Sequence, residues 1–130
     1  MKIERSKTLL IVDDSQPVAD LIEGFLNRRP YRVLKAYDGE DGLRRIRAEE
    51  PDLILLDINM PRLDGYGVLR ELGKNYAGQV IVMTAHRETG IRNFEEYPCV
   101  KAVFTKPMSG EKLVQAIDGL IGDSEPTGEM

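Results

Sequence analysis

Several polar side chains each follow a short apolar run in this chain. The runs lead into Asp13-Asp14, Asp57, Thr84 and Lys106. Carboxylates bind hard cations such as Mg²⁺, and a carboxylate can also accept a phosphoryl group. A hydroxyl and an amine can stabilise the oxygens of that group. These residue types therefore suit phosphoryl transfer, provided that the fold brings them together.

The same runs indicate the elements that would position these side chains. Apolar runs predict strands over residues 8–12, 32–36, 53–56, 80–83 and 102–105. Apolar residues at helical spacing predict helices after Pro17, over 39–50, around 68–72 and after Ser109, while 87–97 has only a weak helical pattern. This alternation predicts an α/β fold with a parallel sheet covered by helices on both faces. Right-handed crossovers place all strand ends, and thus the candidate side chains, at one edge.

Asp57 is the central candidate, because the run before it, Leu53–Leu56, reads as a strand that is buried on both faces. Pro61 disfavours helix just after it, and Gly65 permits a tight turn before the next helix. A carboxylate at this position can be a site residue or simply the first residue of a turn.

Three carboxylates at one edge would repel one another. At least one of them should then have a raised pKa, unless a divalent cation relieves the repulsion. The alternative is a structural cluster of acids and one lysine at the ends of the strands. Co-location of Asp13, Asp14, Asp57, Thr84 and Lys106 favours a functional site.

Length and composition limit the other possibilities. The 130 residues, 42% hydrophobic and 31% charged, suit one globular domain, which we expect over residues 1–122 with a flexible tail over 123–130. The net charge of -4 argues against direct DNA binding. The single Cys99 is expected to be a small buried residue, and no signal peptide or membrane span is evident. A cytoplasmic location is therefore expected.

The ordered set of motifs resembles the receiver domain of two-component response regulators, of the stand-alone type. The matches span about residues 7–122 and comprise Asp13-Asp14, Asp57 with Met60-Pro61 and Gly65, Thr84-Ala85 and Lys106-Pro107. The resemblance implies a doubly wound, flavodoxin-like three-layer fold with strand order 2-1-3-4-5. It also implies that the chain is not an enzyme in the usual sense, but catalyses only its own phosphorylation and autodephosphorylation.

The resemblance implies a role for each site residue. Asp57 would accept the phosphoryl group, which Thr84 and Lys106 would contact. The donor would be a phosphohistidine on a sensor histidine kinase or histidine phosphotransfer protein, or a small phosphodonor such as acetyl phosphate. Output would pass through a downstream effector protein, with the chain a monomer or a weak phosphorylation-dependent dimer.

The resemblance also implies Mg²⁺ as cofactor. Asp14 would bind it directly and Asp13 directly or through water. Asp57 and the backbone carbonyl of Asn59 would complete the protein ligands.

Three positions bear on how the switch works. Many family members have Tyr or Phe three residues before the lysine, whereas this chain has Val103, with Phe104 expected on the opposite face of the strand. Because valine stands in that position, the usual coupling of the threonine to an aromatic ring is not expected here. The resemblance also places Asn59 and His86 beside the approach of the water that hydrolyses the phosphoryl group.

There are three alternative classes of protein. A hydrolase of the haloacid dehalogenase type usually needs a second Asp two residues after the nucleophile, where this chain has Asn59. A nucleotide-binding domain would need a glycine-rich phosphate loop, and G-x-x-x-x-G-K-[ST] is absent from the sequence. A scaffold that is not phosphorylated would not need the acidic residues.

Overall fold

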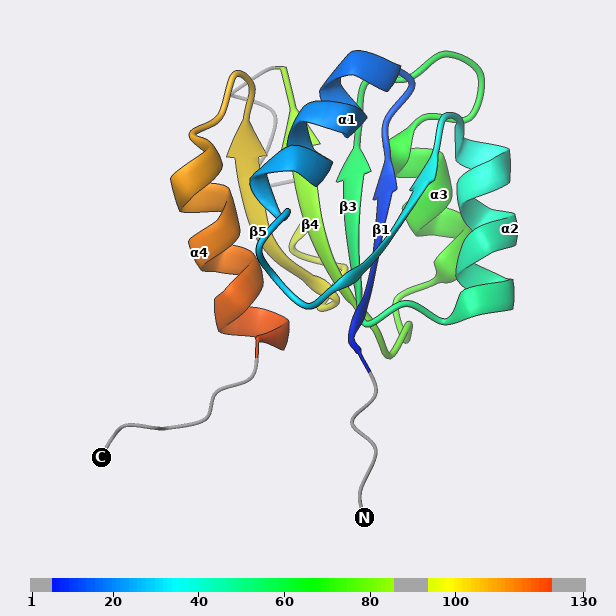
Figure 1. Ribbon diagram of the computed structural model, residues 1–130. Helices are drawn as coiled ribbons and strands as arrows, with labels where there is room; N and C mark the ends of the chain where they lie inside the picture. Colours follow the sequence, from blue (N-terminus) through cyan, green and yellow to red (C-terminus); the bar gives the residue numbers. More distant parts are fainter. Residues whose placement is uncertain (1–5, 86–93, 123–130) are drawn as a thin grey trace.

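Five parallel strands form one sheet in the order β2-β1-β3-β4-β5, seen nearly face-on in Figure 1. The computed structural model describes residues 6–85 and 94–122. The strands are β1 (Thr8–Val12), β2 (Arg32–Ala36), β3 (Leu53–Asp57), β4 (Gln79–Thr84) and β5 (Val100–Thr105). The predicted fold class and strand order are confirmed, with β2 at one edge of the sheet.

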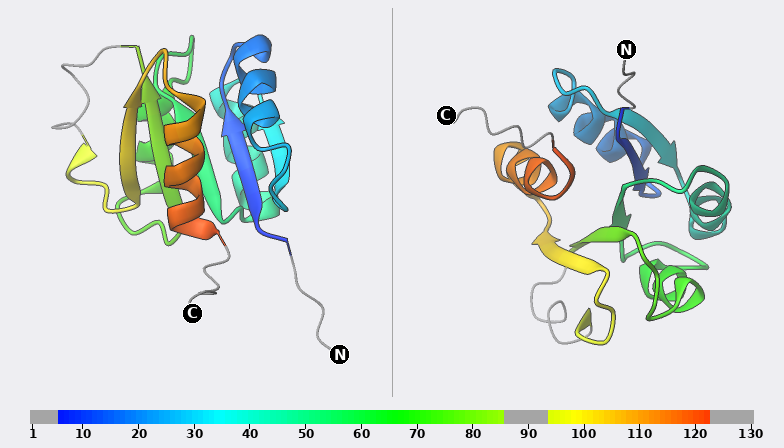
Figure 2. Two further views of the ribbon diagram at one scale, coloured as in Figure 1. Left: turned by 60° about the vertical axis from the view of Figure 1, so that its left-hand side comes forward. Right: turned by 90° about the horizontal axis from the view of Figure 1, so that it is seen from below.

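Helices cover both faces of the sheet, as the end-on view of Figure 2 shows for the described residues. Helices α1 (Gln16–Phe25) and α4 (Gly110–Ile121) lie on one face. Helices α2 (Gly39–Glu49) and α3 (Gly65–Leu72) lie on the other. The result is the three-layer arrangement that the alternation of strands and helices predicted.

The central strand β3 supplies both hydrophobic cores. Leu53 and Leu55 pack towards α1 and α4, whereas Ile54 and Leu56 pack towards α2 and α3. All four side chains are fully buried. Because successive side chains point to opposite faces, a strand buried on both faces needs an unbroken apolar run.

Side-chain caps start the helices close to the edge where the strands end. Asp38 accepts a hydrogen bond from the Asp41 N–H, and Ser109 accepts one from the Lys112 N–H. Asp64 caps α3 in the same way. Such caps satisfy N–H groups that have no partner inside the helix.

The apolar residues at helical spacing after Pro17 do not all face the core. Ile22 and Leu26 are buried, but Leu21 is 57% exposed and Phe25 36%. Leu21 precedes Ile22 by one residue, so its side chain is rotated by about 100° around the helix axis from the buried side chain of Ile22. An apolar residue next to the buried face of a helix is therefore not necessarily part of the core.

Some of the predictions from the sequence concern residues outside the described ranges. They concern His86, most of the weakly helical stretch 87–97, and the tail expected over 123–130. The proposed boundary at residue 122 stays a prediction. Over residues 6–85 and 94–122, no helix is both long enough and apolar enough to cross a membrane.

Gly65 provides a test of how tightly the loop after β3 is packed. A Cβ added there would lie 2.7 Å from the carbonyl oxygen of Asp57, whereas one added at Gly119 in α4 would meet no atom within 4 Å. Gly65→Ala should lower the free energy of unfolding by about 1–3 kcal/mol. Gly119→Ala, the matched control, should raise it by up to about 1 kcal/mol because it restricts the unfolded chain. Urea denaturation measures both, and an unchanged Gly65→Ala protein would show that the loop relaxes freely.

Candidate functional site

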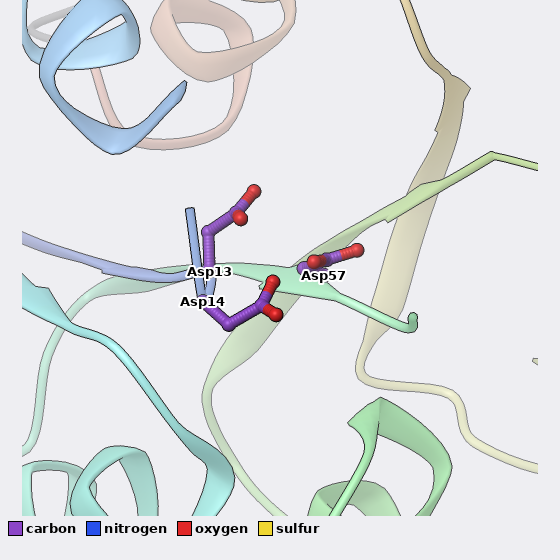
Figure 3. A group of neighbouring side chains, drawn as sticks. All are labelled: Asp13, Asp14 and Asp57. Carbon is purple, nitrogen blue, oxygen red and sulfur yellow. The ribbon is translucent and has the colours of Figure 1, made fainter. Parts of the chain in front are cut away.

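The three candidate carboxylates meet at the carboxyl ends of β1 and β3 (Figure 3). The strands are neighbours, with Val12 opposite Leu56, so the residues that follow them are adjacent. Asp13, Asp14 and Asp57 each place an oxygen within 4.8 Å of the others. Asp13 and Asp57 are buried, whereas Asp14 is exposed.

Lys106 reaches this cluster from the end of β5. Its Nζ lies 3.0 Å from Oδ2 of Asp13 and 3.4 Å from Oδ1 of Asp57. Burial opposes the charged form of Lys106, but the hydrogen bond and charge of Asp13, together with Asp57, outweigh it and raise the pKa. The amine is therefore a fixed cation between two buried carboxylates.

Asp57 has an unusual charge balance. Burial, followed by the charge of Asp13, raises its pKa to about 6, against the lowering effects of Lys106 and the Asn59 N–H. That N–H donates to Oδ1 of Asp57 over 3.1 Å. The raised pKa expected for one of the acids is thus found at Asp57. The carboxylate is still mostly ionised near neutral pH, so it can act as a nucleophile.

Asp13 is held by two donors. Its Oδ1 accepts from the Ser15 N–H over 2.9 Å, and its Oδ2 accepts from Lys106. Ser15 in turn caps α1 through the Val18 N–H. The start of α1 and the end of β5 therefore both orient this carboxylate.

Thr84 ends β4, the strand between β3 and β5, and is buried. Its carbonyl accepts a hydrogen bond from the Lys106 N–H over 2.8 Å. All five predicted residues thus lie at the carboxyl edge of the sheet, on four strands or directly after them. Their chemical roles stay predictions.

The side chain of Asn59 makes a contact that the sequence did not reveal. Its Oδ1 accepts a hydrogen bond from the Ala85 N–H over 2.8 Å. The residue type and its place just after a strand gave the only hint, because the partner lies 26 positions along the chain. The side chain thereby joins the loop after β3 to the residue after β4.

Val103 and Phe104 lie as expected on opposite faces of β5. Val103 packs with the core beneath α2 and α3, and Phe104 with the core beneath α1 and α4. On the side of the sheet where Val103 lies, the ring of Phe94 stacks against the ring of Tyr66 from α3. Their ring centroids are 5.5 Å apart.

Comparison with known proteins decides the family. The family model of the response regulator receiver domain matches residues 9–118. The chain belongs to this family. This receiver domain is therefore neither a haloacid dehalogenase-type hydrolase nor a glycine-loop nucleotide-binding domain.

Solved structures of similar sequence have the same fold. A receiver domain from Francisella is 28% identical, with a TM-score of 0.80 over 88% of this chain and 96% of that one. The N-terminal domain of a response regulator receiver protein from Methanoculleus marisnigri is 30% identical, with a TM-score of 0.69 over 89% of this chain and 97% of that one. The response regulator TrrA from Thermotoga maritima, solved in complex with Mg²⁺–BeF, is 26% identical, with a TM-score of 0.77 over 88% and 99%.

The acidic cluster of this receiver domain fits a magnesium ion. Its carboxylates offer the oxygen ligands that Mg²⁺ prefers, at a spacing that one ion can bridge. Burial is the main cause of the raised pKa of Asp57, and the charge of Asp13 is the second, so the carboxylate of Asp13 repels that of Asp57. A divalent cation would relieve this repulsion.

Proposed function

We propose that this receiver domain accepts a phosphoryl group on Asp57 from the phosphohistidine of a sensor histidine kinase or histidine phosphotransfer protein. The observation that carries the proposal is the buried Asp57 carboxylate, which has Lys106 3.4 Å away and two further carboxylates beside it. Membership of the response regulator receiver family supports it.

In the proposed reaction, an oxygen of Asp57 attacks phosphorus as the P–N bond of the phosphohistidine breaks. The product is an acyl phosphate on Asp57, and the imidazole leaves with the bonding electrons. The amine of Lys106 would neutralise a phosphoryl oxygen, and the hydroxyl of Thr84 would donate a hydrogen bond to another. Thr84 and Lys106, bonded through the backbone, would thus respond together.

Asp13, Asp14, Asp57 and the backbone carbonyl of Asn59 would hold Mg²⁺. The ion would supply positive charge to phosphoryl oxygens during transfer. Asp13 is already oriented by Ser15 and Lys106, which supports a preformed site.

The signal would leave the domain through a change of its partner-binding face. Receiver domains of response regulators interact with kinases and effectors in general. We propose that this one binds a downstream effector, catalyses only its own phosphorylation and autodephosphorylation, and works in the cytoplasm.

Acetyl phosphate provides the test. With Mg²⁺, the wild-type protein should gain the mass of one phosphoryl group in intact-mass spectrometry, and EDTA should suppress most of the gain. Asp57→Asn should abolish it, because an amide is a poor nucleophile. Glu71→Gln, which removes an exposed carboxylate on α3, is the control and should be labelled like wild type. Labelling of Asp57→Asn to the wild-type extent would refute the assignment of Asp57.

A further inference from the structure

The hydrogen bond between Asn59 and Ala85 lies at the position where the backbone hydrogen bonds between β3 and β4 end. The Ile58 N–H donates to the Met83 carbonyl over 2.9 Å, which continues the pairing of β3 with β4 by one residue. In a regular parallel ladder the Ile58 carbonyl would next accept from the Ala85 N–H. That carbonyl instead accepts from the N–H groups of Met60 and Gly65, each over 3.2 Å.

The carboxamide of Asn59 takes the place of the missing carbonyl. Its Oδ1 receives the Ala85 N–H over 2.8 Å. Both residues are exposed, so water could satisfy the N–H if Asn59 did not. Burial therefore does not demand this bond.

The bond lies next to the reacting group. The backbone N–H of the same Asn59 donates to Oδ1 of Asp57, and Ala85 directly follows Thr84 at the end of β4. A phosphoryl group on Asp57 would bring charged acceptor oxygens to this edge, and a charged acceptor attracts an N–H more strongly than a neutral amide does.

We propose that the Asn59 carboxamide is a positioning group that holds the Ala85 N–H while Asp57 is unmodified and releases it to a phosphoryl oxygen. The inference rests on the proposed function. The exchange makes phosphorylation uncouple the loop after β3 from the residue after β4. The bond to Asn59 has to be given up, so its side chain also weakens binding of the phosphoryl group.

Hydrogen exchange at the Ala85 amide tests the resting bond without metal or phosphodonor. In ¹⁵N-labelled protein with EDTA, Asn59→Ala should speed exchange at Ala85 by roughly tenfold or more. Asn59→Asp keeps an acceptor oxygen in place and should restore slow exchange. The intrinsic exchange rate is unchanged, since residues 84 and 85 are the same in every variant. Asn27→Ala, at an exposed site after α1, is the control. Equal exchange in wild type and Asn59→Ala would overturn the proposal.

Titration with beryllofluoride and Mg²⁺ tests the exchange of partners. Asn59→Ala keeps the backbone N–H and carbonyl of residue 59, and it should bind this phosphoryl mimic about two- to tenfold more tightly than wild type. The Ala85 amide should become equally protected in both proteins. Failure of wild type to bind beryllofluoride would contradict the proposed function and the exchange with it. Binding by wild type without any gain in Asn59→Ala would contradict the exchange alone.

Discussion

Asp57→Asn should make the metal-free protein more stable than wild type at about pH 8, by on the order of 2–3 kcal/mol. The pKa of Asp57 is about 6 in the fold, against an ordinary value of 3.8, chiefly because of burial and then because of Asp13. The fold therefore favours the protonated acid, and the ionised carboxylate costs free energy. Asparagine keeps the shape of the side chain without its charge.

The gain should depend on pH in a defined direction. Because its folded pKa is raised, Asp57 contributes stability that is fully present below about pH 4 and is lost as the pH rises through about 6. The advantage of Asp57→Asn should thus be largest above pH 6 and should vanish below pH 4.

Urea denaturation in EDTA at about pH 8, 6 and 4 measures this difference. Glu71→Gln removes an exposed carboxylate on α3 and serves as the control, with an expected change within about 0.5 kcal/mol. A wild-type protein as stable as Asp57→Asn at pH 8 would mean that ionised Asp57 costs the fold nothing.

Lys106→Met should have the opposite effect, lowering the free energy of unfolding by about 2–3 kcal/mol at neutral pH. Methionine fills similar space but leaves the buried carboxylates of Asp13 and Asp57 without their cation. We place the loss below the range for fully buried pairs, because the Lys106 side chain is 24% exposed.

The control for Lys106→Met is Lys74→Met. Lys74 pairs with Glu96 over 3.2 Å, but the two side chains are 65% and 60% exposed, so the loss should stay below about 1 kcal/mol. Urea denaturation of both variants measures the difference. Adding Asp57→Asn to Lys106→Met should recover part of the loss, since one of the unpaired charges disappears. Equal losses in Lys106→Met and Lys74→Met would show that the site lysine is solvated like any surface lysine.

Local sequence determined the elements and the gathering of the site residues. The unbroken apolar run before Asp57 specified a strand buried on both faces, and Asp38 and Ser109 specified where two helices start. Because parallel strands joined by right-handed crossovers end at one edge, the positions of Asp13 and Lys106 at the ends of their runs predicted that both lie at that edge.

The partners of these residues depend on how segments far apart in the sequence are arranged in the folded chain. The amine of Lys106 lies closer to the carboxylate of Asp13 than to that of Asp57. The side chain of Asn59, in the loop after β3, accepts a hydrogen bond from Ala85, which follows β4. The exposure of Leu21 likewise depends on how α1 is rotated against the sheet. Periodicity assigns a residue to a face or to a strand end, but it contains no distances between segments far apart in the chain. Those distances arise from the register of neighbouring strands and from the packing of helices on them, so hydrogen bonds and pKa shifts at the site emerge only with the complete fold.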